Sequence, residues 1–142
     1  MLHFSSEDNL IHAWSSAPHS CDGTRLFLFK WSYNFHMKRD PSKLAIWVSF
    51  PEIPLPFQNL SILRLLGNLF GRFLCTDSRT RAVCHLISPR VCVEVDVSKA
   101  PVESFRITVG EEFRYKQSII FEYGCDYCSS CKRLGHNLEI CR

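Results

Sequence analysis

A cluster of cysteine and histidine near the C-terminal end constrains this chain more than any other feature. The sequence reads Cys128-x2-Cys131-x4-His136-x4-Cys141, with Gly135 directly before the histidine. Two cysteines separated by two residues can point both sulfurs at one ion from a tight turn, and a later histidine and cysteine complete a tetrahedron. Gly135 can adopt a backbone conformation that other residues avoid. The predicted metal ligands are Cys128, Cys131, His136 and Cys141.

This ligand set predicts one Zn²⁺ with a structural role. Three thiolates and one imidazole saturate a tetrahedral zinc ion, which leaves no open position for a substrate. So short a segment has almost no core, and zinc binding contributes on the order of 10 kcal/mol to the folding of such peptides. Cys125 adds a second Cys-x2-Cys pair, but the spacing fits neither an iron–sulfur motif nor a thioredoxin-like site. We therefore expect Cys125 to be a free thiol beside the metal centre.

The composition restricts the class of protein. With 142 residues, 46% hydrophobic and 13% aromatic, the chain is too apolar to be disordered throughout, and it lacks a run of about 20 apolar residues that would span a membrane. Residues 1–8 do not resemble a secretory signal, so we expect an intracellular protein, nuclear or cytoplasmic, without a membrane partner. Its eight cysteines are then expected to be thiols or metal ligands. A net charge of +3 is compatible with a polyanionic partner.

Residues 45–123 carry the pattern of an α+β domain. Apolar and valine-rich runs predict strands over 45–50, 72–76, 90–96, 104–109 and 113–121, the last two forming a hairpin around Gly110. Asn59 can cap a helix that runs to Phe70, and Gly71 is expected to end it in the left-handed region. Residues 77–88 are predicted to be a loop with a short strand around Val83. We expect a small antiparallel sheet with one main helix on one face, followed by a zinc knuckle at 125–142. An RRM-like or ferredoxin-like arrangement is compatible with this order of elements.

Residues 1–44 are interpreted as the remnant of a truncated N-terminal domain. They offer a short helix around Asn9–Trp14 and an aromatic run, Leu26–Trp31, that is predicted to be a strand buried on both faces. A single strand and a short helix cannot bury themselves, so this segment must pack on the following domain or remain loose.

Several further motifs carry a family resemblance. They are Trp31, Ile46–Phe50, Ile53–Leu55, Leu66–Gly71, Asp77 with Thr80, Arg90–Val97 and Phe121–Glu122, followed by the knuckle. The knuckle is similar to those of retroviral nucleocapsid and many retroelement-derived proteins. The preceding stretch resembles a plant domain of unknown function from LINE-type retrotransposon proteins. The first half of that domain has no counterpart here, so we expect a truncated or degenerate copy.

The resemblance implies zinc-dependent binding of single-stranded RNA or DNA with low sequence specificity. The residues expected to contact nucleic acid are Lys132, Arg133 and Arg142 for phosphates, Leu134 for apolar contact and Tyr127 for stacking. The sequence departs from the retroviral pattern at two positions. Ser129 stands where an aromatic residue stacks on a base, and Lys132 replaces a frequent glycine.

Two alternatives accompany this interpretation. The knuckle can instead be a zinc-stabilised clip for a protein partner, which the serine at 129 and the weak net charge favour. Aromatic residues Trp47, Phe50 and Phe73 can be base-stacking platforms on an RRM-like sheet, but at strand positions beside a helix they are expected to be core. No motif indicates an enzyme, because neither a nucleophile triad, a phosphate-binding loop nor a carboxylate pair stands out.

Overall fold

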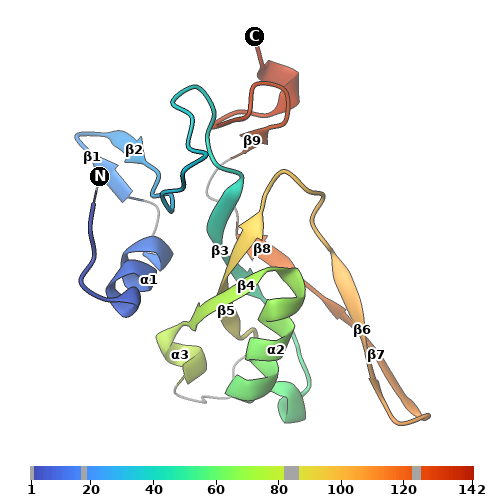
Figure 1. The fold of residues 1–142 in the computed structure, drawn as a ribbon. Coiled ribbons are helices and arrows are strands. Elements are labelled where there is room, and N and C mark those ends of the chain that lie inside the picture. Colours follow the sequence, from blue (N-terminus) through green and yellow to red (C-terminus); the bar gives the residue numbers. More distant parts are fainter. Residues whose placement is uncertain (1, 17–18, 82–86, 123–125) are drawn as a thin grey trace.

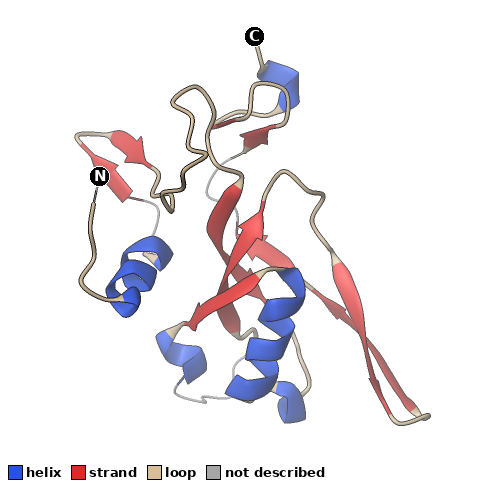
Figure 2. Ribbon diagram, viewed as in Figure 1, coloured by secondary structure: helices blue, strands red, loops and turns tan. Residues whose placement is uncertain are grey.

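The computed structural model describes residues 2–16, 19–81, 87–122 and 126–142. Figures 1 and 2 show a central sheet, a helix against it, a projecting hairpin, and the C-terminal segment at the opposite end from that hairpin. The helical elements are α1 (Glu7–Ser15), η1 (Leu55–Phe57), α2 (Leu60–Phe70), α3 (Ser78–Arg81) and η2 (Leu138–Ile140). The strands are β1 (His19–Cys21), β2 (Thr24–Leu26), β3 (Lys43–Ser49), β4 (Arg72–Thr76), β5 (Arg90–Asp96), β6 (Ser104–Val109), β7 (Phe113–Ser118), β8 (Ile120–Glu122), β9 (Tyr127–Cys128) and β10 (Arg133–Leu134). No helix among the described residues has both the length and the apolar character needed to cross a lipid bilayer.

The central sheet has four antiparallel strands in the order β4-β5-β3-β8. If β3, β4, β5 and β8 are counted as strands one to four, this is the order of ferredoxin-like and RRM sheets. Strand β5 pairs with β3 over its full length, from Lys43 opposite Asp96 to Ser49 opposite Arg90. The predicted α+β class, with a small antiparallel sheet and one main helix, is confirmed.

Helix α2 covers one face of this sheet. As predicted, Asn59 caps the helix, because its side-chain oxygen accepts a hydrogen bond from the Ile62 amide at 2.9 Å. Leu63 and Leu66 face the sheet and pack against strand residues that include Val48 and Val93, forming the main core. Phe50 is fully buried in this core, so its ring is not available to stack on a base, and the half-buried ring of Phe73 packs against the same core.

The end of α2 differs from the prediction at Gly71. Its φ of 172° is extended rather than left-handed. The requirement for glycine comes instead from packing, because a Cβ at this position would overlap the carbonyl oxygen of Glu94 on β5. The chain therefore turns from α2 into β4 at a point of direct backbone contact, which no local sequence signal reveals.

The β6–β7 hairpin also departs from the prediction, since it forms a separate two-stranded ladder outside the four-stranded sheet. The run predicted as one strand over 113–121 is broken at Ile119, and only β8 joins β3. At the base of the hairpin, Phe105 contacts Phe50 and Phe70 beside α2. The hairpin thus occupies the place of the second helix in a ferredoxin-like unit. The strand predicted around Val83 lies outside the described residues.

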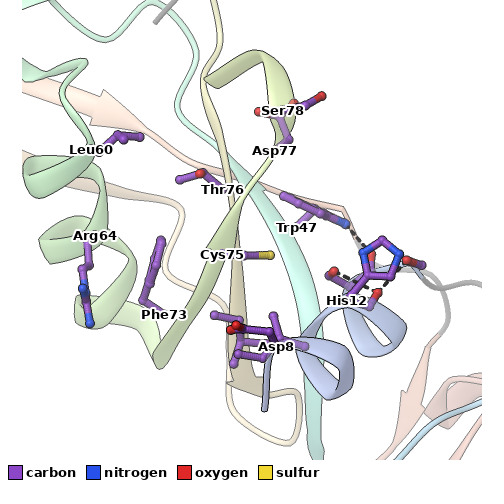
Figure 3. A pocket seen from close by; sticks show the side chains of 14 residues that line it. Asp8, His12, Trp47, Leu60, Arg64, Phe73, Cys75, Thr76, Asp77 and Ser78 are labelled. Atoms are coloured by element: carbon purple, nitrogen blue, oxygen red, sulfur yellow. Dashed lines mark hydrogen bonds between the residues drawn. The ribbon is translucent and has the colours of Figure 1, made fainter. Parts of the chain in front are cut away.

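Helix α1 packs on the opposite face of the sheet and is therefore part of this fold. Trp14 is only 4% exposed and lies in a second cluster with Leu74 and Cys92. The indole nitrogen of Trp47 donates a hydrogen bond of 2.9 Å to the Ser15 carbonyl, which fixes the end of α1 to β3. An open groove of about 890 Å³ lies beside this junction. Figure 3 shows its lining residues, with Trp47 directed towards α1. The RNA-binding face of an RRM-like sheet is partly covered here.

The aromatic run Leu26–Trp31 is not the buried strand that was predicted. Strand β2 ends at Leu26 and pairs only with β1, in an exposed hairpin. Residues 27–32 belong to no strand. Leu28 alone in this run packs against the Trp14 cluster. The prediction was wrong because this run finds no neighbouring strand to pair with.

We expect Trp14→Ala to destabilise the whole domain by about 3–5 kcal/mol, since it removes a buried tryptophan ring between α1 and the sheet. Urea unfolding of the zinc-loaded chain measures the change in the free energy of unfolding. Trp31→Ala is the matched control, because Trp31 is 54% exposed, and it should change the free energy by less than about 1 kcal/mol. Equal effects of the two substitutions would show that α1 does not contribute to the stability of the domain.

Candidate metal centre

The C-terminal hairpin brings the four predicted ligands together. Strands β9 and β10 pair antiparallel, with Arg133 opposite Cys128. The donor atoms of Cys128, Cys131, His136 and Cys141 all lie within 4.8 Å of one another. The Cys131 sulfur lies 3.2 Å from the Nε2 atom of His136. Among the described residues, this is the only group of three or more such side chains arranged to hold a metal ion.

Local backbone geometry explains why this spacing converges. The Lys132 amide donates a hydrogen bond of 2.9 Å to the Cys128 carbonyl, which closes the turn between the first two cysteines. Gly135 has a φ of 103°, and its amide donates to the Asp126 carbonyl at 2.8 Å, which directs the chain towards His136. The predicted need for glycine before the histidine is confirmed, because a residue with a side chain rarely adopts this φ.

The last ligand is positioned by the single turn of η2. The side chain of Asn137 accepts hydrogen bonds from the amides of Glu139 and Ile140, at 3.1 and 3.3 Å. Cys141 follows this capped turn, and its amide donates to the Leu138 carbonyl. Asparagine is a favoured cap because its side-chain oxygen can satisfy amides that have no partner within the turn. The chain between the third and fourth ligands therefore has its own local organisation.

Lys132 has a backbone conformation that is unfavourable for a lysine. Its φ is 59°, in the left-handed region, which costs roughly 1–2 kcal/mol for a residue with a side chain. This is the position where the knuckles that the sequence resembles frequently have glycine. The geometry explains that preference, and it identifies Lys132 as a source of strain next to the metal centre.

The electrostatics of the cluster favour a thiolate at Cys128. Hydrogen bonds from the backbone at Cys131 and at Ser130 lower the pKa of the Cys128 thiol to about 6, against the opposing effect of burial. The neighbouring Cys141 thiol hydrogen-bonds to Cys128, and this contact raises the pKa of Cys141 to about 11. At neutral pH, Cys128 is therefore ready to bind a cation, whereas Cys141 must release its proton. Metal affinity should fall as the pH falls, because protons compete for the same donors.

The donor set fits a closed zinc site. In a tetrahedral shell with Zn–S distances of about 2.3 Å, neighbouring sulfurs lie about 3.8 Å apart. The observed limit of 4.8 Å requires only a small contraction to reach this spacing. Three sulfurs and one imidazole nitrogen fill the four positions. Cys128 is buried and the other three ligands are half-buried, so the metal would be enclosed by its ligands as in structural zinc sites.

The knuckle docks on a segment that sequence analysis did not connect with it. The Asp40 amide donates to the Lys132 carbonyl at 2.8 Å, and the Asp40 carboxylate accepts a hydrogen bond of 2.9 Å from the Leu134 amide. The guanidinium of Arg133 donates to the Lys38 carbonyl at 3.3 Å. Asp40 therefore anchors the metal-binding hairpin to residues 38–40. No sequence signal pointed to this role, because the contact joins positions more than 90 residues apart.

The residues predicted to contact nucleic acid lie in two environments. Lys132, Arg133 and Arg142 are exposed, whereas Leu134 and Tyr127 are half-buried and pair across the hairpin. Desolvation raises the pKa of Tyr127, and the nearby carboxylates of Asp96 and Asp40 raise it further. The tyrosine ring therefore lies in a locally acidic environment, while the exposed cations extend into solvent. Cys125 lies outside the described residues.

Models of protein families, curated protein sequences and solved structures were all compared with this chain, and none matches it. The resemblance to a LINE-type retrotransposon domain therefore stays a prediction from the sequence motifs. The metal centre and its surroundings are therefore the features of this chain that indicate a function.

We expect the purified chain to bind one zinc ion and Cys131→Ser to abolish this stoichiometry, since the substitution removes one of the three sulfurs. Native mass spectrometry measures the bound metal directly. Cys21→Ser is the control, because Cys21 is an exposed thiol outside the cluster. Zinc retained at full occupancy by Cys131→Ser, or lost equally by both variants, would contradict this ligand assignment.

We expect Lys132→Gly to increase zinc affinity by up to about fivefold, because it relieves roughly 1 kcal/mol of backbone strain. Competition with a chromophoric chelator measures the affinity. Lys132→Ala is the matched control, since it removes the same charge but keeps a side chain in the left-handed region. If alanine and glycine raise the affinity equally, charge rather than backbone conformation is responsible.

Proposed function

We propose that this chain binds single-stranded nucleic acid through a zinc-stabilised knuckle formed by residues 126–142. The observation that carries the proposal is the convergence of four donors within 4.8 Å in a hairpin whose exposed side chains include Lys132 and Arg133. Zinc would hold the short hairpin rigid, and the cations would contact phosphates. The resemblance of the sequence to retroelement knuckles supports the same function.

Affinity in this proposal comes mainly from charge and apolar contact. Lys132, Arg133 and Arg142 can each neutralise a phosphate, and Leu134 offers a small apolar surface. Three phosphate contacts contribute about −2 to the slope of log affinity against log salt on single strands. Ser129 provides no ring for a base and the ring of Tyr127 is half-buried, so the hairpin itself offers little of the stacking that contributes about 1–3 kcal/mol per base. Low sequence specificity follows from this chemistry.

A protein-binding clip is the second candidate. It is favoured by Leu138 and Ile140, which are 61% and 65% exposed on η2. In that case the zinc would again be structural, but the contact surface would be the apolar side of η2. The two candidates differ in their response to salt, because apolar contact is not weakened when salt screens charges.

We expect labelled single-stranded oligonucleotides to bind the zinc-loaded chain and to be released when a chelator removes the metal. Lys132→Ala should reduce the magnitude of the salt slope by about 0.7, because one phosphate contact is lost. Fluorescence anisotropy at several salt concentrations measures both effects.

Lys116→Ala is the matched control, since Lys116 is an exposed lysine on the β6–β7 hairpin, far from the knuckle in Figure 1. It should leave the slope unchanged. Binding that is indifferent to both salt and chelator would overturn the proposal and favour the protein-binding candidate.

A further inference from the structure

Aromatic residues occupy every second position in the segment that connects β2 to the turn before β3. They are Phe27, Phe29, Trp31, Tyr33 and Phe35, and we refer to Phe27–Phe35 as the aromatic segment. Two pairs of these rings lie beside each other. The ring centroids of Phe27 and Phe29 are 6.5 Å apart, and those of Trp31 and Tyr33 are 4.8 Å apart. The segment thus presents adjacent aromatic surfaces rather than isolated rings.

These rings are exposed to a degree that the fold alone does not explain. Tyr33 is 94% exposed, Trp31 54% and Phe35 46%. Within the segment, only Leu28 packs against the second core cluster. Exposing large rings is unfavourable, and a contiguous exposed apolar surface usually marks a binding site. The segment therefore has the character of a contact surface for another molecule.

The charge around the rings indicates the class of that molecule. Residues 24–43 contain five basic residues and one acidic residue, a net charge of +4 that exceeds the +3 of the whole chain. The basic residues are Arg25, Lys30, Lys38, Arg39 and Lys43. The acidic residue, Asp40, is engaged with the Leu134 amide of the knuckle. Exposed rings among cations are suited to single-stranded nucleic acid. Its bases can stack on the rings, and the cations can neutralise its phosphates.

The residues that directly follow the aromatic segment are hydrogen-bonded to the metal-binding hairpin. Three residues after Phe35, the Lys38 carbonyl accepts a hydrogen bond from Arg133, and Asp40 bonds to both Lys132 and Leu134. Figure 1 shows the same proximity, with the loop before β3 lying against the C-terminal segment. A strand lying on the rings would therefore reach the exposed cations of the knuckle.

We propose that the aromatic segment is a base-stacking platform for single-stranded nucleic acid, with the knuckle holding the adjacent phosphates. This inference rests on the proposed function and assigns the stacking that Ser129 cannot provide. Bases stack on Trp31, Tyr33 and their neighbours, while Lys30 and the cations of the knuckle contact the backbone. Stacking on any base is possible, so the platform adds affinity without adding sequence preference.

The main test is the double variant Trp31→Ala/Tyr33→Ala, titrated as the full zinc-loaded chain with labelled oligo(dT) and oligo(U). We expect affinity to fall at least about tenfold, from the loss of two stacked bases. Both rings are exposed, so the variant should keep the thermal stability of the parent chain. Phe113→Ala is the control, because Phe113 is an exposed ring on the distant β6–β7 hairpin, and it should leave affinity unchanged. Comparison of the two oligonucleotides distinguishes DNA from RNA as the preferred strand.

A second measurement tests the charge contribution. Lys30→Ala should reduce the magnitude of the salt slope by about 0.7, as expected for one phosphate contact. An unchanged slope would exclude Lys30 from the contact. Oligonucleotides that contain 5-iodouracil should crosslink to Trp31, Tyr33 or Phe35, and mass spectrometry identifies the positions.

The outcomes separate this inference from the proposed function. If the parent chain binds, but the double variant binds equally and crosslinks fall only within 126–142, the platform is overturned and the knuckle function stands. If binding survives Cys131→Ser and chelation but is lost in the double variant, the knuckle function is overturned and the platform stands. If neither oligonucleotide binds the parent chain, both the platform and the knuckle function are overturned. The exposed rings would then be candidates for contact with a protein partner.

Discussion

The convergence of four donor atoms that could hold one cation is the constraint on which the C-terminal part of this structure depends. Within residues 126–142, only Cys128 is buried, and the apolar side chains of Leu138 and Ile140 are largely exposed. Hydrophobic burial therefore contributes little to the stability of this hairpin. Hydrogen bonds to the residue 38–40 segment orient it, but they are few and partly exposed to water. Coordination of a metal is the one interaction here with enough free energy to fix the chain.

The sheet has a different role, because one of its faces is covered and the other is partly covered. Helix α2 and the base of the β6–β7 hairpin cover one face, and α1 packs on the other through Trp14. An RRM binds RNA on aromatic residues of an open sheet face. Here the corresponding ring, Trp47, is hydrogen-bonded to α1 and covered by Arg90 at 4.8 Å. Arg90 is itself held by Glu122. The sheet is consequently a scaffold, and the exposed rings lie outside it.

Sequence reasoning succeeded where the controlling interaction is local. The cap at Asn59 and the glycine before His136 each depend on neighbours a few residues away. It failed where distant segments decide the outcome. Gly71 is required by the Glu94 carbonyl on another strand, and Asp40 is paired with Leu134 across most of the chain. The run Leu26–Trp31 has the composition of a buried strand, but composition does not reveal whether a partner strand exists. The alternating aromatic residues of Phe27–Phe35 can be read from the sequence. Their exposed fractions in the structure indicate a contact surface instead of a buried strand.

The hydrogen bonds at residues 38–40 link the metal centre to the aromatic segment, and this link has a thermodynamic consequence. Asp40 bonds to the backbone on either side of Arg133, within the hairpin that carries two of the metal ligands. Metal binding that orders this hairpin would also restrict Asp40, which follows the aromatic segment by five residues. Under the proposed function, a strand that stacks on the rings would bind a surface already restricted in motion, and less conformational entropy would be lost on binding. By reciprocity, nucleic acid held on the rings would strengthen metal binding by the same factor. The proposal therefore treats the metal centre and the rings as one binding unit, although they lie far apart in the sequence.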